Sequence, residues 1–329
     1  MKDPAEPVVS VVVPTCGRPE LLNRCIEALC RQTLPGARYE VIIVDDRPSP
    51  RTAEIVTEWR RRTEPHGPAF CYLPNHGPHG PAAARNRGWH AARSAVIAFT
   101  DDDTVPTAQW LEHGLVALGP RGEALRGRIV MPLDGVPTDY ERDAQRLETA
   151  DFVTANCFCR KSVLQRLGGF DERFRMAWRE DSDLYFRLLD LGVEVIQAPD
   201  AVVVHPVRPA RWGVSITQQK KILFDALLYK KHPLRYRQKI RARPRWDYYA
   251  IGLLLLAVPF GLTTGHRWIA LIGAAGWLCM TARFCVERLR GTARTWSHVG
   301  EMIVTSVVIP PCALFWRMVG ALRFRVPFT

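Results

Sequence analysis

Hydrophobic and polar residues alternate in short blocks along the first two hundred positions, and each block has the length of a strand or a helix. Short apolar runs predict strands at residues 8–13, 39–44, 69–73 and 95–99. Between them, apolar residues at helical spacing predict helices at residues 19–30, 52–61, 82–93 and 107–118. Apolar strands separated by helices are typical of a parallel sheet that is covered on both faces. We therefore expect an α/β fold in this part of the chain.

The pattern changes beyond residue 245. Residues 248–264 contain no charged side chain, residues 268–286 contain one, and only three residues separate the two runs. A membrane-spanning helix needs about 20 apolar residues, so the two runs predict a spanning helical hairpin. A third apolar run, residues 302–316, is shorter and contains two consecutive prolines. We expect this run to span the membrane, to re-enter it or to lie at its surface.

These patterns divide the chain into three expected parts. Residues 1–210 form the α/β domain, residues 211–247 an amphipathic and basic juxtamembrane segment, and residues 248–329 the membrane region. Within the middle segment, residues 216–229 have apolar positions at helical spacing with lysines on both sides. This spacing predicts a helix that lies on the bilayer surface or packs into a core.

The charge of the chain is strongly positive and unevenly distributed. The formal net charge is +12, and residues 230–245 contain eight basic side chains and no acidic one. Such a run binds either nucleic acid or an anionic membrane. Because this run directly precedes a predicted membrane hairpin, we expect anionic lipids as its partner and no nucleic acid. The positive-inside rule then places both ends of the hairpin on the cytoplasmic side.

The cysteines and the N-terminus are consistent with that location. The nine cysteines form no Cys-x-x-Cys motif and include several on apolar faces, so we expect free thiols in a reducing compartment. The first ten residues contain no apolar signal core. The sequence therefore predicts a multi-pass membrane protein with its α/β domain on the cytoplasmic face.

Carboxylates are concentrated directly after two of the predicted strands. Asp45 and Asp46 follow the second strand, and Asp101, Asp102 and Asp103 follow the fourth. In parallel sheets the carboxyl ends of the strands meet at one edge, where ligands bind. Adjacent carboxylates repel one another and are costly to bury, so a positive group is needed beside them. Helix capping explains one aspartate of the triplet but not three.

The spacing of Asp101 and Asp103 predicts a metal site of the DxD type. Carboxylate oxygens are suitable ligands for Mg²⁺ or Mn²⁺, and such ions commonly complete their coordination with substrate phosphates and water. The cation would supply the missing positive charge. A DxD spacing by itself is weak evidence, because it occurs often by chance.

Several segments follow each other along the chain in an order that resembles a known family. They are VVVPTCGRPELLNRCIEAL, VIIVDDRPS, GPAAARNRGWHAA, IAFTDDDTVP, LGGFDERF and WREDSDLYFRL. The chain resembles, over about residues 8–205, the inverting family 2 glycosyltransferases with the GT-A fold. The resemblance implies a Rossmann-like, mostly parallel sheet with helices on both faces, a nucleotide-sugar donor, and transfer to an acceptor hydroxyl.

The resemblance also implies roles for single residues in donor and metal binding. Thr15 would contact the nucleobase, and Asp45 or Asp46 would hydrogen-bond the base or ribose. Arg85 would lie near the nucleotide. The other donor-binding and metal-binding candidates are Arg18, Asp101, Asp102, Asp103 and His205. Of these, Asp103 is the better candidate for direct metal contact, and Asp101 and His205 are further metal ligands.

For the reaction itself, the resemblance points to the acidic pair in WREDSDL. Asp181 would be the general base, and Glu180 would position the acceptor. Trp178 either lines the acceptor site or packs against neighbouring residues. One position departs from the family pattern, since Arg47 stands after the first acidic pair where a small residue is usual.

The expected function is therefore a membrane-anchored, metal-dependent glycosyltransferase of the hexosyltransferase type. Its acceptor would be a lipid-linked or cell-envelope glycan, as expected for polysaccharide biosynthesis. A nucleotidyl- or phosphoryl-transferring enzyme is an alternative, but it predicts a glycine-rich loop after the first strand, where this chain has one glycine. A non-catalytic sugar-binding protein is another, but it predicts an incomplete acidic set, and here the set is complete.

Overall fold

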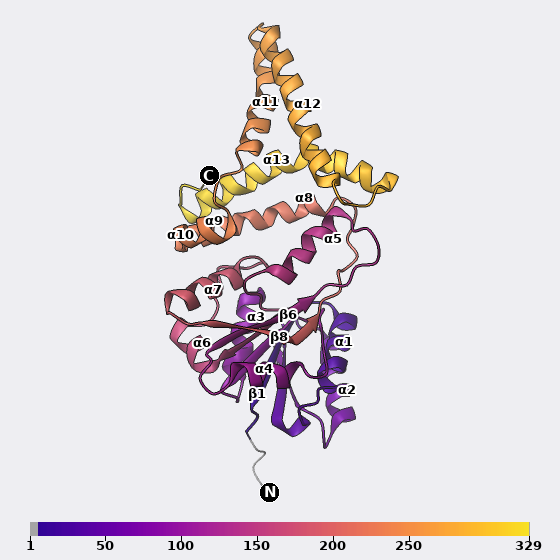
Figure 1. Ribbon diagram of the computed structural model, residues 1–329, viewed down its shortest axis with the longest axis vertical. Helices are drawn as coiled ribbons and strands as arrows, with labels where there is room; N and C mark the ends of the chain where they lie inside the picture. The colour runs from indigo at the N-terminus through magenta and orange to yellow at the C-terminus, as the bar shows by residue number, and fades with distance from the viewer. Residues whose placement is uncertain (1–5, 329) are drawn as a thin grey trace. The chain divides into compact units, whose positions relative to one another are not determined.

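The computed structural model describes residues 6–328, which form two compact units (Figure 1). Unit 1 comprises the chain up to Pro132 together with Arg146–Val207. Unit 2 comprises Leu133–Gln145 and the chain from Arg208 onward. Leu133–Gln145 therefore belongs with the C-terminal helices, although it lies within the span expected for the α/β domain. The division at residues 210 and 247 stays a prediction.

Eight strands in unit 1 form one mixed sheet, in the order β3-β2-β1-β4-β7-β6-β8-β5. They are β1 (Val9–Thr15), β2 (Tyr39–Asp45), β3 (Ala69–Pro74), β4 (Val96–Thr100), β5 (Val105–Pro106), β6 (Ala124–Val130), β7 (Asn156–Arg160) and β8 (Val195–Val204). The first four strands run parallel, as do β6 and β8, whereas β7 runs antiparallel to both β4 and β6. The expected α/β fold with a mostly parallel sheet is confirmed, but the antiparallel β7 has no counterpart in the strands that the sequence predicted.

Helices cover both faces of this sheet. They are α1 (Pro19–Cys30), α2 (Pro50–Thr63), α3 (Pro81–Ala91), α4 (Trp110–Leu118), α6 (Lys161–Leu167) and α7 (Glu180–Asp190). Successive side chains of a strand point to opposite faces. Accordingly, Val11 and Val13 of β1 pack into a core with α1, α2 and α4, whereas Val12 packs into a second core with α3, α6 and α7.

A close contact fixes the position of α3 on the sheet. A Cβ atom on Gly88 would lie 2.3 Å from Cγ1 of Val12 and 3.1 Å from Cγ2 of Val44. Only glycine leaves room for the helix backbone at this distance. Because Arg85 lies one turn earlier on α3, this contact also sets the depth at which the Arg85 side chain leaves the helix.

Unit 2 consists of helices. They are α5 (Asp139–Ala144), α8 (Val214–Gln218), η3 (Gln219–Ile222), α9 (Leu223–Lys231), α10 (Pro233–Arg235), η4 (Tyr236–Ile240), α11 (Trp246–Thr263), α12 (Arg267–Leu289) and α13 (Trp296–Phe324). The single amphipathic helix expected at residues 216–229 is thus divided among α8, η3 and α9. Three helices, α11, α12 and α13, are long and apolar enough to cross a membrane.

The helices α11 and α12 form the expected hairpin, which extends from the other helices of unit 2 (Figure 1). Small residues allow the two helix backbones to approach each other. A Cβ atom on Gly261 would lie 2.5 Å from the backbone nitrogen of Ala270, and one on Gly273 would lie 3.0 Å from the Leu254 carbonyl oxygen. The third apolar run forms the continuous helix α13 of 29 residues, which extends beyond residues 302–316 at both ends.

A buried arginine connects Leu133–Gln145 to the C-terminal helices within unit 2. Arg288, near the end of α12, donates to Oδ2 of Asp139 on α5 at 2.8 Å from Nη2 and 3.1 Å from Nε. Its Nη1 donates to Thr305 Oγ1 of α13 at 2.6 Å and to Ser306 Oγ at 3.2 Å. One guanidinium group therefore holds α5, α12 and α13 together.

Candidate active site

The ends of β1 and β4 are joined by polar contacts around Asp102. Thr15, the last residue of β1, donates from Oγ1 to Asp102 Oδ2 at 2.7 Å. Arg18 follows in the same loop, and its Nη2 lies 2.7 Å from Asp102 Oδ1. Burial raises the pKa of Asp102 to about 7, although Arg18 and Thr15 oppose this shift. The hydrogen bond between Thr15 and Asp102 thus connects the ends of β1 and β4. The expected contacts of both residues with a donor stay predictions.

Asp45 and Asp46, at the end of β2, organise the neighbouring loops. Asp45 is fully buried and accepts hydrogen bonds from the backbone nitrogens of Arg47 and Ser49, at 3.2 and 3.1 Å. Arg47, the departure from the family pattern, is thus part of a turn closed by Asp45. Asp46 accepts from the backbone nitrogen of Gly80, at 3.0 Å. The Asp46 side chain is 13% exposed, and the expected contact of Asp45 or Asp46 with a donor stays a prediction.

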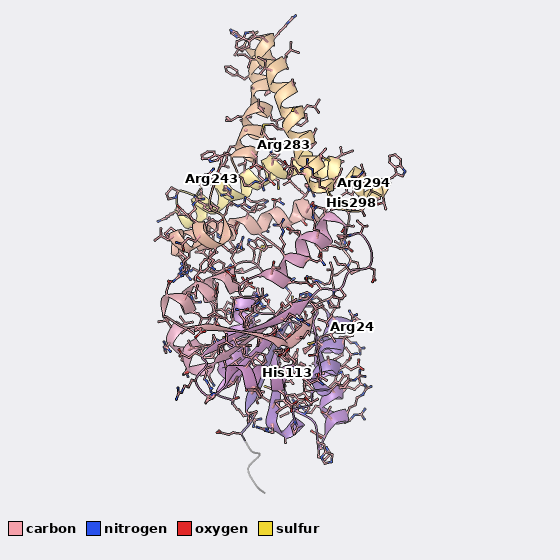
Figure 2. All side chains as sticks on the ribbon, in the orientation of Figure 1. Arg24, His113, Arg243, Arg283, Arg294 and His298 are labelled. Atoms are coloured by element: carbon pink, nitrogen blue, oxygen red, sulfur yellow. The ribbon has the colours of Figure 1, made fainter. Side chains whose placement is uncertain are left out.

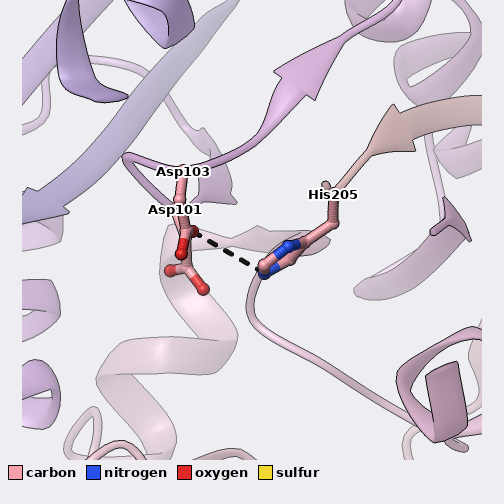
Figure 3. A group of neighbouring side chains, drawn as sticks. All are labelled: Asp101, Asp103 and His205. Atoms are coloured by element: carbon pink, nitrogen blue, oxygen red, sulfur yellow. Dashed lines mark ion pairs between the residues drawn. The ribbon is translucent and has the colours of Figure 1, made fainter. Parts of the chain in front are cut away.

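The structure brings together the three residues expected to bind a metal. Asp101, Asp103 and His205 each offer a ligand atom, and these atoms lie within 4.8 Å of one another. Figure 3 shows the two carboxyl groups and the imidazole facing one another, with His205 Nε2 3.6 Å from Asp103 Oδ1. His205 follows β8, whose strand neighbours are β5 and β6, and so reaches the site from a distant part of the sequence. Two carboxylates and an imidazole are a suitable ligand set for Mn²⁺, and with water also for Mg²⁺.

Arg85 connects this cluster to the second acidic pair. The side chain of Arg85 is buried, and it donates to Asp101 Oδ1 at 2.7 Å and to Glu180 Oε1 at 3.0 Å. Burial alone would raise the pKa of Asp101, but Arg85 and His205 outweigh it and hold that pKa below its ordinary value. The sequence placed Arg85 near the nucleotide; in the structure it is the bridge between two carboxylates, and a nucleotide contact stays a prediction.

The second acidic pair lies at the N-terminus of α7. The preceding residue, Arg179, has a left-handed backbone with φ of 76°, a conformation that costs free energy and is often found at functional sites. Glu180 is buried, and burial together with Asp181 raises its pKa to about 7 in spite of Arg85. Burial also raises the pKa of Asp181. The pKa of Glu180 is thus in the range in which a carboxyl group can exchange protons near neutral pH.

The two carboxyl groups of this pair have different surroundings. Asp181 is only half-buried, and its Oδ1 accepts hydrogen bonds from the backbone nitrogen and Oγ of Ser182, at 2.6 and 3.2 Å. Its Oδ2 has no hydrogen-bond partner among the described residues. Glu180 accepts from Arg85 through Oε1, and its Oε2 is buried without a hydrogen-bond partner. Trp178, also half-buried, has the Arg179 guanidinium over its ring at 4.5 Å. Asp181 is thus the more exposed member of the pair, and its expected role as the proton acceptor stays a prediction.

Two residues that the sequence did not single out also shape this edge of the sheet. Tyr72 of β3 donates from its hydroxyl to Asp45 Oδ2 at 3.1 Å, and Asn75 Nδ2 donates to Asp46 Oδ1 at 2.8 Å. Both lie at or just after the end of the third predicted strand, the same place that marked the acidic residues after the second and fourth. Their position at the end of a predicted strand was the sequence feature that could have identified Tyr72 and Asn75 as site residues.

Two sequence models of known families match the chain. The one described as "Glycosyl transferase family 2" matches residues 10–168, and the one described as "Glycosyl transferase family group 2" matches residues 139–319. The fold and the acidic site are thus those of a glycosyltransferase that uses a nucleotide-sugar donor. The chain belongs to glycosyltransferase family 2, as the sequence motifs indicated.

Individual proteins give the same result. The chain is 27% identical over 215 residues to glycosyltransferase AglE of Haloferax volcanii, which covers 62% of this chain and 68% of AglE. It is 36% identical over 151 residues to the pre-mycofactocin glycosyltransferase of Mycobacterium tuberculosis, covering 40% of this chain and 32% of that enzyme. The solved structure of mannosyltransferase PcManGT from Pyrobaculum calidifontis, in complex with GDP-Man and Mn²⁺, is similar with a TM-score of 0.60 and 19% identity, over 94% of this chain and 88% of that one. This likeness confirms the GT-A fold.

The metal site yields a direct prediction. Asp103→Asn removes one negative charge and one anionic oxygen ligand. Mn²⁺ affinity, measured by isothermal titration calorimetry, is therefore expected to fall more than about 100-fold. That loss exceeds the loss expected when a residue that only orients a metal ligand is replaced. Asp46→Asn makes the same change of charge at the same sheet edge and is expected to leave Mn²⁺ affinity within about twofold of the original, since Asp46 lies outside the cluster. Equal losses in the two variants would show that general charge, not this cluster, attracts the ion.

Proposed function

We propose that the chain is a membrane-bound, metal-dependent hexosyltransferase that acts with inversion. It would transfer a sugar from a nucleoside-diphosphate donor to a hydroxyl group of a lipid-linked or cell-envelope glycan. One observation carries the proposal: Arg85 holds Asp101 of the metal cluster and Glu180 of the second acidic pair within one hydrogen-bonded group. A site for a leaving diphosphate and a site for an attacking hydroxyl are thereby placed side by side.

The chemistry divides between these two sides. A divalent cation bound by Asp101, Asp103 and His205 would act as a Lewis acid toward the leaving diphosphate; PcManGT, solved with Mn²⁺, supports this assignment. On the other side, Oδ2 of Asp181 accepts the proton of the acceptor hydroxyl as its oxygen bonds to the anomeric carbon. The bond from that carbon to the diphosphate breaks at the same time. One base and one displacement give inversion, with no covalent enzyme intermediate.

The hairpin of α11 and α12 supports the membrane part of the proposal. Large apolar side chains point outward along both helices, with Leu256 67% and Leu271 71% exposed, and lipid is the surrounding in which such exposure is favourable. Arg243, Arg283 and Arg294 gather at the foot of the hairpin, away from its turn (Figure 2). This distribution favours a cytoplasmic foot and a turn on the opposite side. The catalytic unit would then lie on the cytoplasmic face.

The long helix α13 is better placed along the membrane surface than across it. It packs against α9, η3 and α8 and lies across the foot of the hairpin, not alongside it (Figure 1). Its inner face contains buried polar residues such as Thr305 and Ser306, and its outer face exposes apolar ones, namely Trp296, Ile303, Val304, Val307, Phe315, Met318 and Leu322. An amphipathic helix of this kind lies in the bilayer interface. Of the three alternatives from the sequence, we therefore favour the surface position.

The proposed base is tested by two variants of neighbouring residues. Asp181→Asn is expected to lower the transfer rate about 10²–10⁴-fold, because it removes the proton acceptor, while donor and Mn²⁺ affinities stay unchanged. Glu180→Gln is expected to be milder. It also removes a negative charge beside Asp181, which lowers the pKa of Asp181, so the acidic limb of the pH–rate profile moves to lower pH. If Glu180→Gln caused the larger loss, Glu180 would be the base; if neither variant slowed transfer, this pair would have no catalytic role.

The proposed topology is tested by cysteine labelling in intact cells. With a maleimide that does not cross membranes, His266→Cys is expected to react from outside, because it lies in the hairpin turn. Arg294→Cys and Arg325→Cys, on either side of α13, are both expected to react only after permeabilisation. The unsubstituted chain gives the background from native cysteines. Labelling of Arg325→Cys but not Arg294→Cys from outside would show that α13 spans the bilayer, and protection of His266→Cys would contradict the hairpin.

A further inference from the structure

A buried arginine on α13 has no acidic partner. Arg317 is 6% exposed, its Nη1 is buried without a hydrogen-bond partner, and it forms no ion pair with a carboxylate among residues 6–328. A buried charge without a counter-ion is strongly unfavourable. Arg288 of the same unit shows the usual solution, because Asp139 neutralises it. An anion from outside the described chain would provide the same compensation for Arg317.

Aromatic rings hold the Arg317 side chain in place. The Arg317 guanidinium lies 4.4 Å from the centre of the Phe328 ring, a contact that favours a cation over the ring face. Phe328 in turn packs against Tyr229 and Tyr236, at 5.3 and 5.5 Å between ring centres. The position of the charge is therefore fixed by packing, which is the property of a preformed binding site.

A second arginine without an acidic partner lies in the same cluster. The backbone nitrogen of Arg241 donates to the backbone carbonyl of Tyr236 at 2.9 Å, so the two residues are neighbours along the main chain. The half-buried Arg241 side chain forms no ion pair among residues 6–328. Burial, followed by Arg245 and Arg317, lowers the pKa of Arg241, as expected for cations close to one another. An acidic residue, Asp225, lies next to Tyr236 and accepts a hydrogen bond from the Tyr236 hydroxyl at 3.2 Å.

The place of this cluster in the sequence indicates which anion it meets. Arg241 lies five residues before Trp246, where the hairpin helix α11 begins, so it is at the depth of lipid headgroups if the hairpin spans the bilayer. Arg245 lies closer still, but Asp247 pairs with it at 2.5 Å. Arginine binds phosphate through several hydrogen bonds at once. Among residues 6–328, Arg241 and Arg317 form no ion pair with a carboxylate, and Asp225 offsets the charge of Arg241 only in part.

We propose that Arg317 and Arg241 form a binding site for the phosphate group of a membrane lipid. The inference rests on the proposed membrane position of the hairpin, but not on the transfer reaction. Two lipids carry the required chemistry: an ordinary anionic phospholipid, or a lipid acceptor that ends in phosphate. In either case the phosphate supplies a counter-ion that residues 6–328 do not provide. A bound phosphate would also connect α13 to the segment before α11.

The test measures lipid binding to the purified full-length protein in neutral detergent, with EDTA present so that the metal site holds no phosphate. Dissociation constants are measured for phosphatidylglycerol, a phosphodiester, and phosphatidic acid, a monoester, with phosphatidylcholine and inorganic phosphate as comparisons. Arg317→Gln and Arg241→Gln are each expected to weaken binding of the anionic lipids at least about tenfold, as loss of a charged hydrogen bond does. The matched control is Arg323→Gln, which replaces an exposed arginine on the same helix. This variant is expected to bind the anionic lipids as tightly as the unsubstituted protein does.

Thermal unfolding separates this role from a purely structural one. Without lipid, Arg317→Gln is expected to be at least as stable as the original chain, because it removes an uncompensated buried charge. With anionic lipid, the original chain gains stability and Arg317→Gln does not. Tighter binding of phosphatidic acid than of phosphatidylglycerol would identify a terminal phosphate as the ligand, and an equal response to inorganic phosphate would show that the lipid tail contributes nothing.

Two results would overturn the inference. One is unchanged binding of the anionic lipids by both glutamine variants, which would place the lipid site elsewhere. The other is a large loss of stability of Arg317→Gln in lipid-free detergent, which would show that Arg317 already has its partner within the chain. Either result can occur while sugar transfer is intact, so failure of this inference is distinguishable from failure of the proposed function.

Discussion

Concentrated negative charge at the carboxyl end of β4 is the constraint on which the site depends. Three aspartates follow one buried strand, and the acidic pair at the start of α7 adds two more carboxyl groups nearby. The chain supplies two arginines against them: Arg18 pairs with Asp102, and Arg85 joins Asp101 to Glu180. Arg18 also lies 3.4 Å from Oδ2 of Asp103, and Asp101 and Asp103 lie close to the His205 imidazole. In the proposed function, a divalent cation would complete the compensation and would attract the diphosphate of a donor to the same place.

Much of this arrangement could be predicted from the sequence, because buried parallel strands leave a local signal. Apolar runs predicted β1 to β4, and the acidic residues at their ends indicated the sheet edge at which Asp45 and Asp101 lie. The partners of Arg85 could not be predicted, since Glu180 lies 95 positions away and nothing in either local segment specifies the other. The antiparallel β7 and the attachment of Asp139 to Arg288 were missed for the same reason. Pairing between distant segments is decided by packing, not by local pattern.

The two units show the same electrostatic problem with opposite sign. In unit 1, Asp101, Asp103 and His205 lie close enough together to hold a cation, and in unit 2 the buried Arg317 has a nitrogen without a hydrogen-bond partner. Each excess is positioned by rigid surroundings: the sheet edge for the aspartates, and the aromatic group of Tyr229, Tyr236 and Phe328 for the arginines. Preorganised charge of this kind costs stability and is retained where a ligand compensates it. Donor chemistry and membrane attachment can therefore be read from the unbalanced charges of one chain.

The most direct test of this account is the release of nucleoside diphosphate by the purified protein when it is offered a panel of nucleotide sugars together with a lipid extract as acceptor source. Each donor is assayed with Mn²⁺ and again with EDTA. The account predicts release from one donor or a few related ones, dependent on both the metal and the lipid extract. No release from any donor, or release that is equally fast in EDTA, would contradict it.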